Sequence, residues 1–194
     1  MEKTLVSKQE IRSKHLAMRD NLSYSERASK SGQILELLKQ EEGFQRAQII
    51  LAYMDYRSEV MTTELVKELL TDTSKRVFVP KVEGMDIRFY EITSLEELTQ
   101  GYQGIREPVQ DSRKLFTQHT AAQGNCFLIM PGAVFDRNKE RLGYGKGFYD
   151  RFVQCFPDMP RAGLAFACQI TAQIPVESHD KKADFVVTEK GVIR

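Results

Sequence analysis

Cysteine is scarce in this chain. The 194 residues include three, Cys126, Cys155 and Cys168, and the sequence has no Cys-x-x-Cys pair. The three histidines are not spaced from these cysteines as metal ligands usually are. The pattern argues against zinc and redox chemistry, and it predicts free thiols in a reducing compartment.

Long apolar runs are missing as well. No stretch of the sequence approaches the roughly 18 consecutive apolar residues of a membrane-spanning helix. The opening residues, MEKTLVSKQEIRSK, contain no apolar core of signal-peptide length. From these absences we expect a cytoplasmic protein that does not engage a membrane.

A large excess of charge of either sign is also absent. The chain has 28 Lys and Arg against 27 Asp and Glu, a formal net charge of +1. Proteins that bind nucleic acid through phosphate contacts usually carry a basic excess or a basic block. We therefore expect no nucleic-acid partner, although a local anion site is compatible with this balance.

What the chain does contain is the composition of a globular protein, with 41% hydrophobic and 28% charged residues. This length suits one folding unit, and we expect residues 1–194 to form a single domain and to act as a monomer. Two capping boxes, Ser7-x-x-Glu10 and Ser23-x-x-Glu26, predict helices that end near Arg19 and near Glu41. Gly43 is expected to close the second helix.

Helical and strand patterns alternate along the rest of the chain. A third helix is predicted over Thr62–Leu70, whereas Gly101–Ala122 is expected to have little regular structure. Strands are predicted at Ala47–Met54, Arg76–Pro80, Asp86–Ile92, Cys126–Met130, Arg161–Ala167 and Asp184–Thr188. This order predicts an α/β fold, a single three-layer domain with a mostly parallel central sheet flanked by helices.

A glycine-rich loop after the predicted strand Cys126–Met130 is the most informative stretch. Pro131 and Gly132 end that strand, and Asp136–Glu140 reads as a polar turn. Glycines then occupy positions 143, 145 and 147, and a helical pattern begins near Gly147. A strand, a glycine loop and a helix can bring backbone N–H groups and a helix N-terminus to a phosphate.

Two cations in this loop strengthen the anion-binding interpretation. Lys146 lies between the last two glycines, and Arg141 precedes the first. The common phosphate signatures do not fit, because Phe148 stands where Gly-x-Gly-x-x-Gly needs glycine and Gly147 where a Walker A loop needs Ser or Thr. As a bare pattern, the loop is also compatible with a mobile surface segment that carries incidental charges.

The longer string PGAVFDRNKERLGYGKGFYDR resembles the signature of the 5-formyltetrahydrofolate cyclo-ligase family, also called methenyltetrahydrofolate synthetases. Other features of that family recur in the expected order along almost the whole chain. They are Lys8 with Arg12, Ser58-Glu59-Val60, Gly104-Ile105-Arg106-Glu107-Pro108, and Gln169, Pro175 and His179-Asp180.

The resemblance implies a ligase that uses ATP to convert 5-formyltetrahydrofolate to 5,10-methenyltetrahydrofolate and releases ADP and phosphate. The formyl oxygen is phosphorylated, and N10 of the folate then closes the ring. Such phosphoryl transfer depends on positioning and on charge stabilisation. The resemblance therefore makes Lys146 and Arg141 the expected catalytic residues.

The resemblance also assigns two sets of binding residues. Those for ATP are Lys8, Arg12, Arg141, Leu142, Gly143, Tyr144, Gly145, Lys146, Gly147, Phe148 and Tyr149. Those for the folate are Met54, Glu59, Tyr144, Gly145, Lys146, Gly147 and Phe148. Tyr144, Phe148 and Tyr149 could flank a flat ring, and one or more of them could equally belong to the core.

Two aspartates, Asp150 and Asp180, are the expected ligands of Mg²⁺, which usually takes one or two carboxylates beside a nucleotide. Without the resemblance, Asp150 reads as favourable charge in the first turn of a helix and Asp180 as a solvated turn residue. Asp184 is close enough in sequence to replace Asp180 in this role.

Two other classes of function fit parts of the sequence. One is a sugar-phosphate isomerase or acyl-CoA transferase on a similar α/β layer, which would not need ATP. The other is a nucleotide- or RNA-binding module that uses Arg137, Lys139, Arg141 and Lys146 as a basic patch. Steep salt dependence of RNA affinity would favour the second class.

Overall fold

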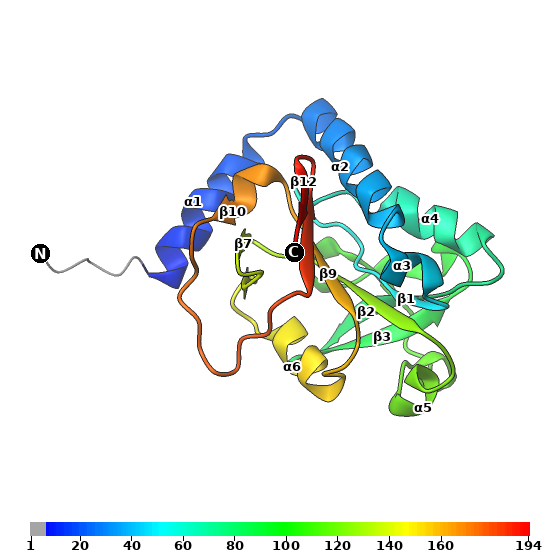
Figure 1. The fold of residues 1–194 in the computed structure, drawn as a ribbon. Coiled ribbons are helices and arrows are strands. Elements are labelled where there is room, and N and C mark those ends of the chain that lie inside the picture. Colours follow the sequence, from blue (N-terminus) through cyan, green and yellow to red (C-terminus); the bar gives the residue numbers. More distant parts are fainter. Residues whose placement is uncertain (1–6) are drawn as a thin grey trace, which may run out of the picture.

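The computed structural model describes residues 7–194 and is built on a seven-stranded sheet with the order β12-β11-β9-β6-β1-β2-β3 (Figure 1). The inner pairs from β11 to β2 are parallel, and the edge strands β12 and β3 are antiparallel to their neighbours. The strands are β1 (Ile49–Leu51), β2 (Arg76–Glu83), β3 (Asp86–Ile92), β6 (Cys126–Met130), β9 (Arg161–Leu164), β11 (Phe185–Thr188) and β12 (Gly191–Ile193). The predicted mostly parallel sheet is thereby confirmed.

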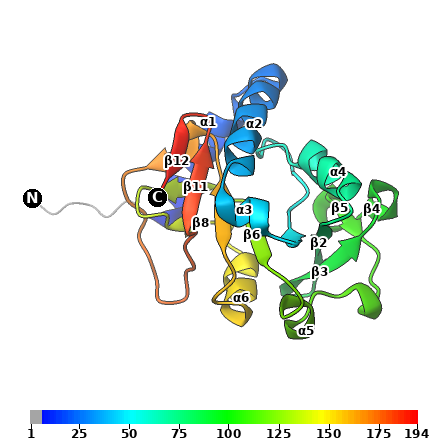
Figure 2. The same ribbon diagram turned by 45° about the vertical axis from the view of Figure 1, so that its right-hand side comes forward.

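Helices cover both faces of this sheet, as Figures 1 and 2 show. Successive side chains of β1 alternate between two apolar clusters, because neighbouring residues of a strand point to opposite faces. Ile50 joins the cluster formed with α2 (Tyr24–Lys39), α3 (Glu42–Arg46) and α4 (Thr63–Thr71). Leu51 joins the cluster formed with α6 (Phe148–Cys155). The three-layer α/β prediction is correct.

The two capping boxes form as predicted. The Ser7 hydroxyl accepts the Glu10 N–H at 3.2 Å, and the Glu10 carboxylate accepts the Ser7 N–H at 2.8 Å at the start of α1 (Lys8–Asp20). Ser23 and Glu26 make the same pair of bonds before α2. Because such a cap contributes on the order of 1 kcal/mol, each helix begins at the position that its local sequence dictates.

A small second sheet carries the segment that leads into the glycine loop. Its order is β10 (Ile170–Thr171), β7 (Val134–Asp136) and β8 (Arg141–Leu142). Asp136 ends β7 and opens the predicted polar turn, since its carbonyl oxygen accepts the Lys139 N–H at 3.0 Å. Its buried carboxylate accepts the N–H groups of Asn138, Glu140 and Ile174. These bonds fix the hairpin that delivers Arg141 and the loop to one place.

Several predicted boundaries were wrong. Helix α2 ends at Lys39, and Gly43 lies inside the short helix α3. The apolar run 47–54 forms only three residues of strand, since Tyr53 and Met54 are buried beyond the end of β1. Likewise β9 ends at Leu164. Continuous burial does not distinguish a strand from the buried segment that follows it.

Strand β2 is longer than predicted, because its pairing with β3 continues to Glu83. Pro80 is tolerated within β2 because β1 pairs only with residues 76–78. Beyond residue 78 this side of β2 is an edge of the sheet, where no backbone N–H is needed for pairing. No helix of residues 7–194 is long and apolar enough to cross a bilayer.

The segment 101–122 has more structure than predicted. A hairpin pairs β4 (Leu98–Gln100) with β5 (Arg106–Pro108), and a short helix α5 (Gln118–Ala121) follows. Single turns of 3-10 helix occupy Leu95–Glu97, Tyr102–Gly104, Ser112–Lys114 and, later in the chain, Ala167–Gln169. The first of these turns is capped by Ser94, whose hydroxyl accepts the Glu96 N–H.

Candidate active site

A cavity of about 450 Å³ opens beside the carboxyl ends of the parallel strands, where ligands bind in open α/β sheets. Met54 lies beyond the end of β1 and Pro131 beyond the end of β6, and both line it. Helix α1, the β4–β5 hairpin and residues 177–180 complete its wall.

Every residue expected to bind ATP, folate or metal lines this one cavity. They are Lys8, Arg12, Met54, Glu59, Arg141, Leu142, Gly143, Tyr144, Gly145, Lys146, Gly147, Phe148, Tyr149, Asp150 and Asp180. The fold thus brings together side chains that are far apart in sequence, while the role of each remains a prediction. Asp184, the alternative to Asp180, does not line the cavity, and its carboxylate accepts the Arg161 N–H at 2.8 Å.

The glycine loop connects β8 to α6, and its backbone requires glycine. Gly145 and Gly147 have φ values of 88° and 66°, in the left-handed region that other residues avoid. At Gly143 a Cβ would lie 2.8 Å from Nη1 of Arg141, so a larger residue there would displace the end of that side chain. Gly147 also precedes α6 without a side-chain cap, so the helix N-terminus is left to other hydrogen-bond acceptors.

Helix α1 contributes cations that are held by the opposite wall. Arg12 Nε donates to the carbonyl oxygen of Gly143 at 2.8 Å, which ties the helix to the glycine loop. Lys8 Nζ lies 2.6 Å from the Asp180 carboxylate and 3.2 Å from that of Glu177. Burial opposes the charge of Lys8, but these two carboxylates outweigh it and raise its pKa. Positive charge at a helix N-terminus is thereby compensated.

Arg141 and Asp150 form an ion pair at the base of the loop. Arg141 Nη2 donates to Asp150 Oδ1 at 2.8 Å, and the Lys181 N–H donates to the same oxygen at 3.1 Å. The Arg141 guanidinium also lies over the ring of Tyr149, 5.6 Å from its centroid. Its Nε is buried and has no hydrogen-bond partner within residues 7–194. Arg141 is thus held in place by Asp150 and by the ring of Tyr149.

Asp180 faces the same cavity from the segment before β11. Its carboxylate accepts from Lys8 Nζ and, at 2.8 Å, from the Glu177 N–H, and despite burial these contacts lower its pKa. Within residues 7–194 no group of three or more His, Cys, Asp or Glu side chains could hold a metal alone. Two carboxylates in one cavity do fit Mg²⁺ that arrives with phosphate oxygens and water as its other ligands.

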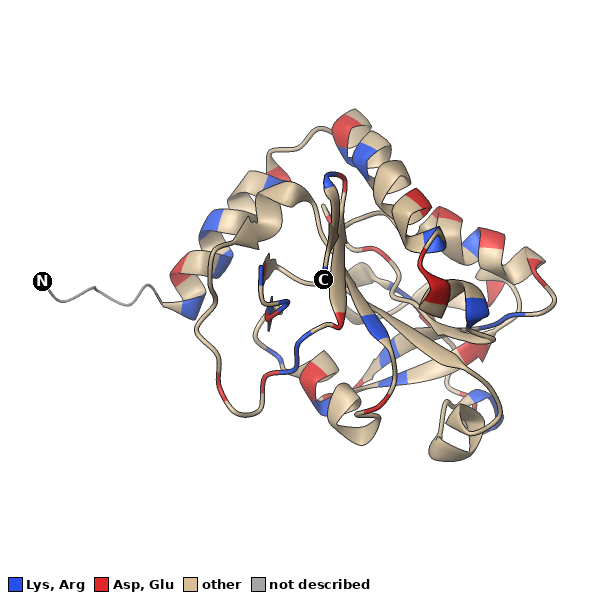
Figure 3. Ribbon diagram, viewed as in Figure 1, with Lys and Arg blue, Asp and Glu red and all other residues tan. Residues whose placement is uncertain are grey.

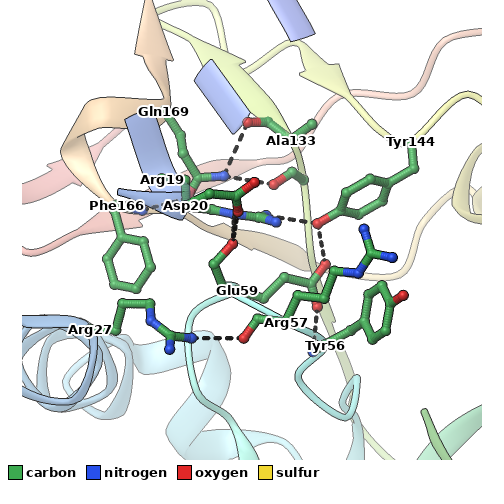
Figure 4. A network of polar contacts seen from close by, with 12 residues as sticks. Arg19, Asp20, Arg27, Tyr56, Arg57, Glu59, Ala133, Tyr144, Phe166 and Gln169 are labelled. Atoms are coloured by element: carbon green, nitrogen blue, oxygen red, sulfur yellow. Dashed lines mark hydrogen bonds and ion pairs between the residues drawn. The ribbon is translucent and has the colours of Figure 1, made fainter. Parts of the chain in front are cut away.

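Glu59 is buried, with 6% of its surface exposed, and belongs to the hydrogen-bond network in Figure 4. Its Oε1 accepts from the Tyr144 hydroxyl at 2.6 Å, and its Oε2 accepts from the Tyr56 N–H at 3.0 Å. Burial raises the pKa of Glu59, while the Tyr144 hydrogen bond and the charge of Arg19 oppose that rise. A carboxylate fixed in this way suits a ligand that presents N–H donors.

Arg19 is a member of this network that was not predicted. Residues 8, 12, 15 and 19 recur at the spacing of one helical face. This spacing could have placed Arg19 on the same face of α1 as Lys8 and Arg12. Tyr102 and Glu107 of the β4–β5 hairpin also line the cavity and were missed. Their segment was expected to be irregular, which hid their position.

The aromatic residues of the loop differ in their surroundings. Tyr149 packs edge-on against Phe89 of β3, with ring centroids 6.3 Å apart, and so belongs partly to the core. Phe148 makes an edge-on contact with Tyr102 at 6.2 Å, and Tyr144 is 43% exposed. Phe148 and Tyr144 are therefore the better candidates for contact with a flat ring.

Charges of both signs are interspersed over helices α1, α2 and α4 (Figure 3). The basic patch considered for RNA binding required Arg141, but that side chain is buried and paired with Asp150. The four proposed cations therefore do not form one exposed surface.

Comparisons with known proteins agree on one family. The sequence model of the 5-formyltetrahydrofolate cyclo-ligase family matches residues 4–189. A probable 5-formyltetrahydrofolate cyclo-ligase of Schizosaccharomyces pombe is 29% identical over 189 residues, which cover 90% of this chain and 89% of that protein. The 5-formyltetrahydrofolate cyclo-ligase of Mus musculus is 29% identical over 179 residues, with 87% and 86% covered.

Solved structures give the same result. The NMR structure of 5,10-methenyltetrahydrofolate synthetase from Aquifex aeolicus matches with a TM-score of 0.83 and 34% identity, covering 96% of this chain and 92% of that one. A 5,10-methenyltetrahydrofolate synthetase from Mycoplasma pneumoniae has a TM-score of 0.73 at 22% identity, covers 95% and 99% of the two chains, and shares the fold.

Proposed function

This chain belongs to the 5-formyltetrahydrofolate cyclo-ligase family, and from that premise we propose that it closes 5-formyltetrahydrofolate to 5,10-methenyltetrahydrofolate with consumption of ATP. The observation that carries the proposal is one shared cavity for the glycine loop and Glu59, joined by the 2.6 Å bond between Tyr144 and Glu59. If the loop holds the phosphates and Glu59 accepts the pterin N–H groups, the two sites are adjacent, as the transfer of a phosphoryl group to a folate requires.

The proposed reaction has two chemical steps. The formyl oxygen forms a bond to the γ-phosphorus of ATP while the bond from that phosphorus to ADP breaks. N10 then attacks the activated formyl carbon, the carbon–oxygen bond to phosphate breaks, and N10 loses its proton. Phosphorylation is needed because a formamide oxygen is otherwise a poor leaving group.

The residues of the loop would act through charge and position. Lys146 is exposed and has no ion pair within residues 7–194, so its amine is available to a transferring phosphoryl group. Arg141, held by Asp150, would supply a second, fixed positive charge. Glu59 would receive N–H groups of the pterin and so orient the formyl oxygen toward the loop.

Mg²⁺, when bound with ATP, would neutralise part of the phosphate charge, and we assign Asp150 and Asp180 to hold it. Each carboxylate is paired with a cation, Asp150 with Arg141 and Asp180 with Lys8.

Asp150→Asn and Asp180→Asn are each expected to raise the Mg²⁺ concentration needed for half-maximal activity by roughly tenfold, the loss of about 1.4 kcal/mol of binding. The double variant should be much less than additively worse, because residues that act through one ion are coupled. Activity titrations with Mg²⁺ provide the measurement, and Asp184→Asn, outside the cavity, is the matched control. Additive effects, or an unchanged Mg²⁺ dependence of Asp180→Asn, would confine the metal assignment to Asp150.

The direct test is to incubate the protein with ATP, Mg²⁺ and 5-formyltetrahydrofolate and to follow the methenyl chromophore together with ADP. We expect one ADP for each methenyl product and no reaction when ATP is left out. An isomerase or a CoA transferase would release no folate-dependent ADP. An RNA-binding module would bind RNA with a steep salt dependence and would leave the folate unchanged.

We infer further that residues 1–194 act as one domain and as a monomer, because the predicted site residues gather in one cavity and need no second copy to bring them together. Sedimentation of the active protein would test the monomer.

A further inference from the structure

Arg19 is an unusual residue of α1, because it is a cation with only 2% of its surface exposed. Burying a guanidinium is costly unless its donors and its charge are satisfied. The nearest carboxylate, that of Asp20, is 4.0 Å from Nε. Two hydroxyl groups accept from the guanidinium directly: Nε donates to Ser58 Oγ at 2.9 Å, and Nη1 donates to the Tyr144 hydroxyl at 2.7 Å.

The chemistry of these groups fixes the direction of every hydrogen bond in the network. A guanidinium can only donate, so both hydroxyl oxygens accept from Arg19. Each hydroxyl then donates its own O–H to a second acceptor. Tyr144 donates to Glu59 Oε1 at 2.6 Å, and Ser58 donates to the carboxylate of Asp20. Arg19 is therefore the origin of two hydrogen-bond chains, and each ends on a carboxylate (Figure 4).

One of these chains joins three separate parts of the cavity wall. Arg19 belongs to α1, Tyr144 to the glycine loop, and Glu59 to the segment that follows β1. With Tyr144 on Oε1 and the Tyr56 N–H on Oε2, the Glu59 carboxylate is fixed at both oxygens. Each oxygen retains a second lone pair that a ligand can use.

We propose that Arg19 is a positioning residue for the reduced folate: acting through the Tyr144 hydroxyl, it holds Glu59 in the orientation that receives the pterin ring. This inference rests on the proposed function, since it assigns the orientation of the carboxylate to a residue that itself need not touch the substrate. It also makes the glycine loop, through Tyr144, part of the folate site.

A second consequence concerns the charge of Glu59. Facing this carboxylate are Arg19 from α1, Tyr144 and Tyr149 from the loop and α6, and Asp55 and Tyr53 from its own segment. Burial raises the pKa of Glu59, and the Tyr144 hydrogen bond and the Arg19 charge counteract it. Loss of either group should raise that pKa further. Folate binding that needs the ionised carboxylate would then be lost at a higher pH than in the wild type as the pH is lowered.

The test compares Arg19→Met, Arg19→Lys and Tyr144→Phe with the wild type. For each enzyme, the Michaelis constants for the folate and for ATP are measured, together with kcat/KM for the folate against pH. We expect Arg19→Met and Tyr144→Phe to raise the folate KM by about tenfold or more, as expected when a buried charge-assisted contact is lost. In Arg19→Met, which lies outside the expected ATP-binding set, the ATP KM should change by no more than about twofold. In both variants the acid limb of the profile should move to higher pH.

Two comparisons separate positioning from a merely structural role. Arg19→Lys retains the charge and should return the acid limb toward that of the wild type. The matched control is Arg27→Met, which removes a guanidinium that donates to the backbone oxygen of Arg57 but does not line the cavity. It should leave both Michaelis constants and the profile unchanged. The double variant Arg19→Met/Tyr144→Phe should be no worse than the worse single variant, since both act along one chain.

An unchanged folate KM and pH profile in Arg19→Met and Tyr144→Phe would overturn the inference, as would the same shifts in Arg27→Met. If Arg19→Met does not fold, Tyr144→Phe and Arg19→Lys decide. A wild type that forms no methenyl product would refute the proposed function instead. In that case the hydrogen-bond chain from Arg19 to Glu59 is tested by a ¹³C NMR titration of Glu59. The pKa of Glu59 should rise in Tyr144→Phe, and an unchanged pKa would refute the positioning role of the chain.

Discussion

Replacing Lys146 by methionine is expected to lower kcat/KM for the folate substrate by more than about 100-fold. A charge-assisted contact to a transferring phosphoryl group contributes on the order of 3 kcal/mol in the transition state, which corresponds to roughly 150-fold in rate. Lys146 is exposed on the glycine loop, and no partner within residues 7–194 holds its amine. Its charge is therefore available for the phosphoryl group, and its loss should leave the free energy of unfolding nearly unchanged.

Steady-state kinetics and denaturant unfolding of the same preparation measure the two quantities. Lys67→Met is the matched control, because Lys67 is an exposed lysine of α4 outside the cavity. Its kcat/KM should equal that of the wild type. A Lys146→Met enzyme with near wild-type kcat/KM would remove this residue from the mechanism, whatever the fate of the other assignments.

Glu59→Gln is expected to weaken the binding of the folate by about 30-fold or more and to change ATP binding by less than about threefold. Hydrogen bonds to a charged group contribute roughly 1.5–3 kcal/mol, and the amide both removes the charge and places an NH₂ group beside the donors of Tyr56 or Tyr144. The affinity for ATP should change little, because the cations expected to bind its phosphates lie on α1 and on the glycine loop.

Calorimetry with each ligand alone distinguishes the two sites. The control is Glu189→Gln, which alters another buried carboxylate that is bonded to Lys30 and does not line the cavity. That variant is expected to lose stability without any preference between the ligands. Equal losses of folate and ATP affinity in Glu59→Gln would mean that Glu59 supports the structure of the cavity and does not contact the pterin.

The features that sequence predicted correctly are those whose cause is local. The starts of α1 and α2 follow from capping boxes that span only four residues each. The glycine loop followed by α6 is also encoded locally, since the left-handed backbone at Gly145 and Gly147 favours glycine whatever the surrounding tertiary structure. Met54 and Glu59 follow β1 of the parallel sheet, whose strand ends meet at one edge, and this places them at the cavity.

The features that were missed depend on partners that are distant in sequence. Arg19 looks like one more cation on a polar helix, and its burial arises because Ser58 and Tyr144 lie beside it in space. The strands of the β4–β5 hairpin are three residues long and show no clear apolar alternation. The true end of β1 is set by where its neighbours stop pairing, and an apolar run does not reveal that point.

The most direct test of the central claim follows the formyl oxygen itself. With 5-formyltetrahydrofolate labelled with ¹⁸O in the formyl group, the proposed reaction bonds that oxygen to the γ-phosphorus and releases it on phosphate. Mass spectrometry should therefore find one ¹⁸O in the inorganic phosphate for each methenyl product formed. Unlabelled phosphate, with the ¹⁸O recovered in water, would show that ATP is hydrolysed without activating the formyl group and would contradict the account.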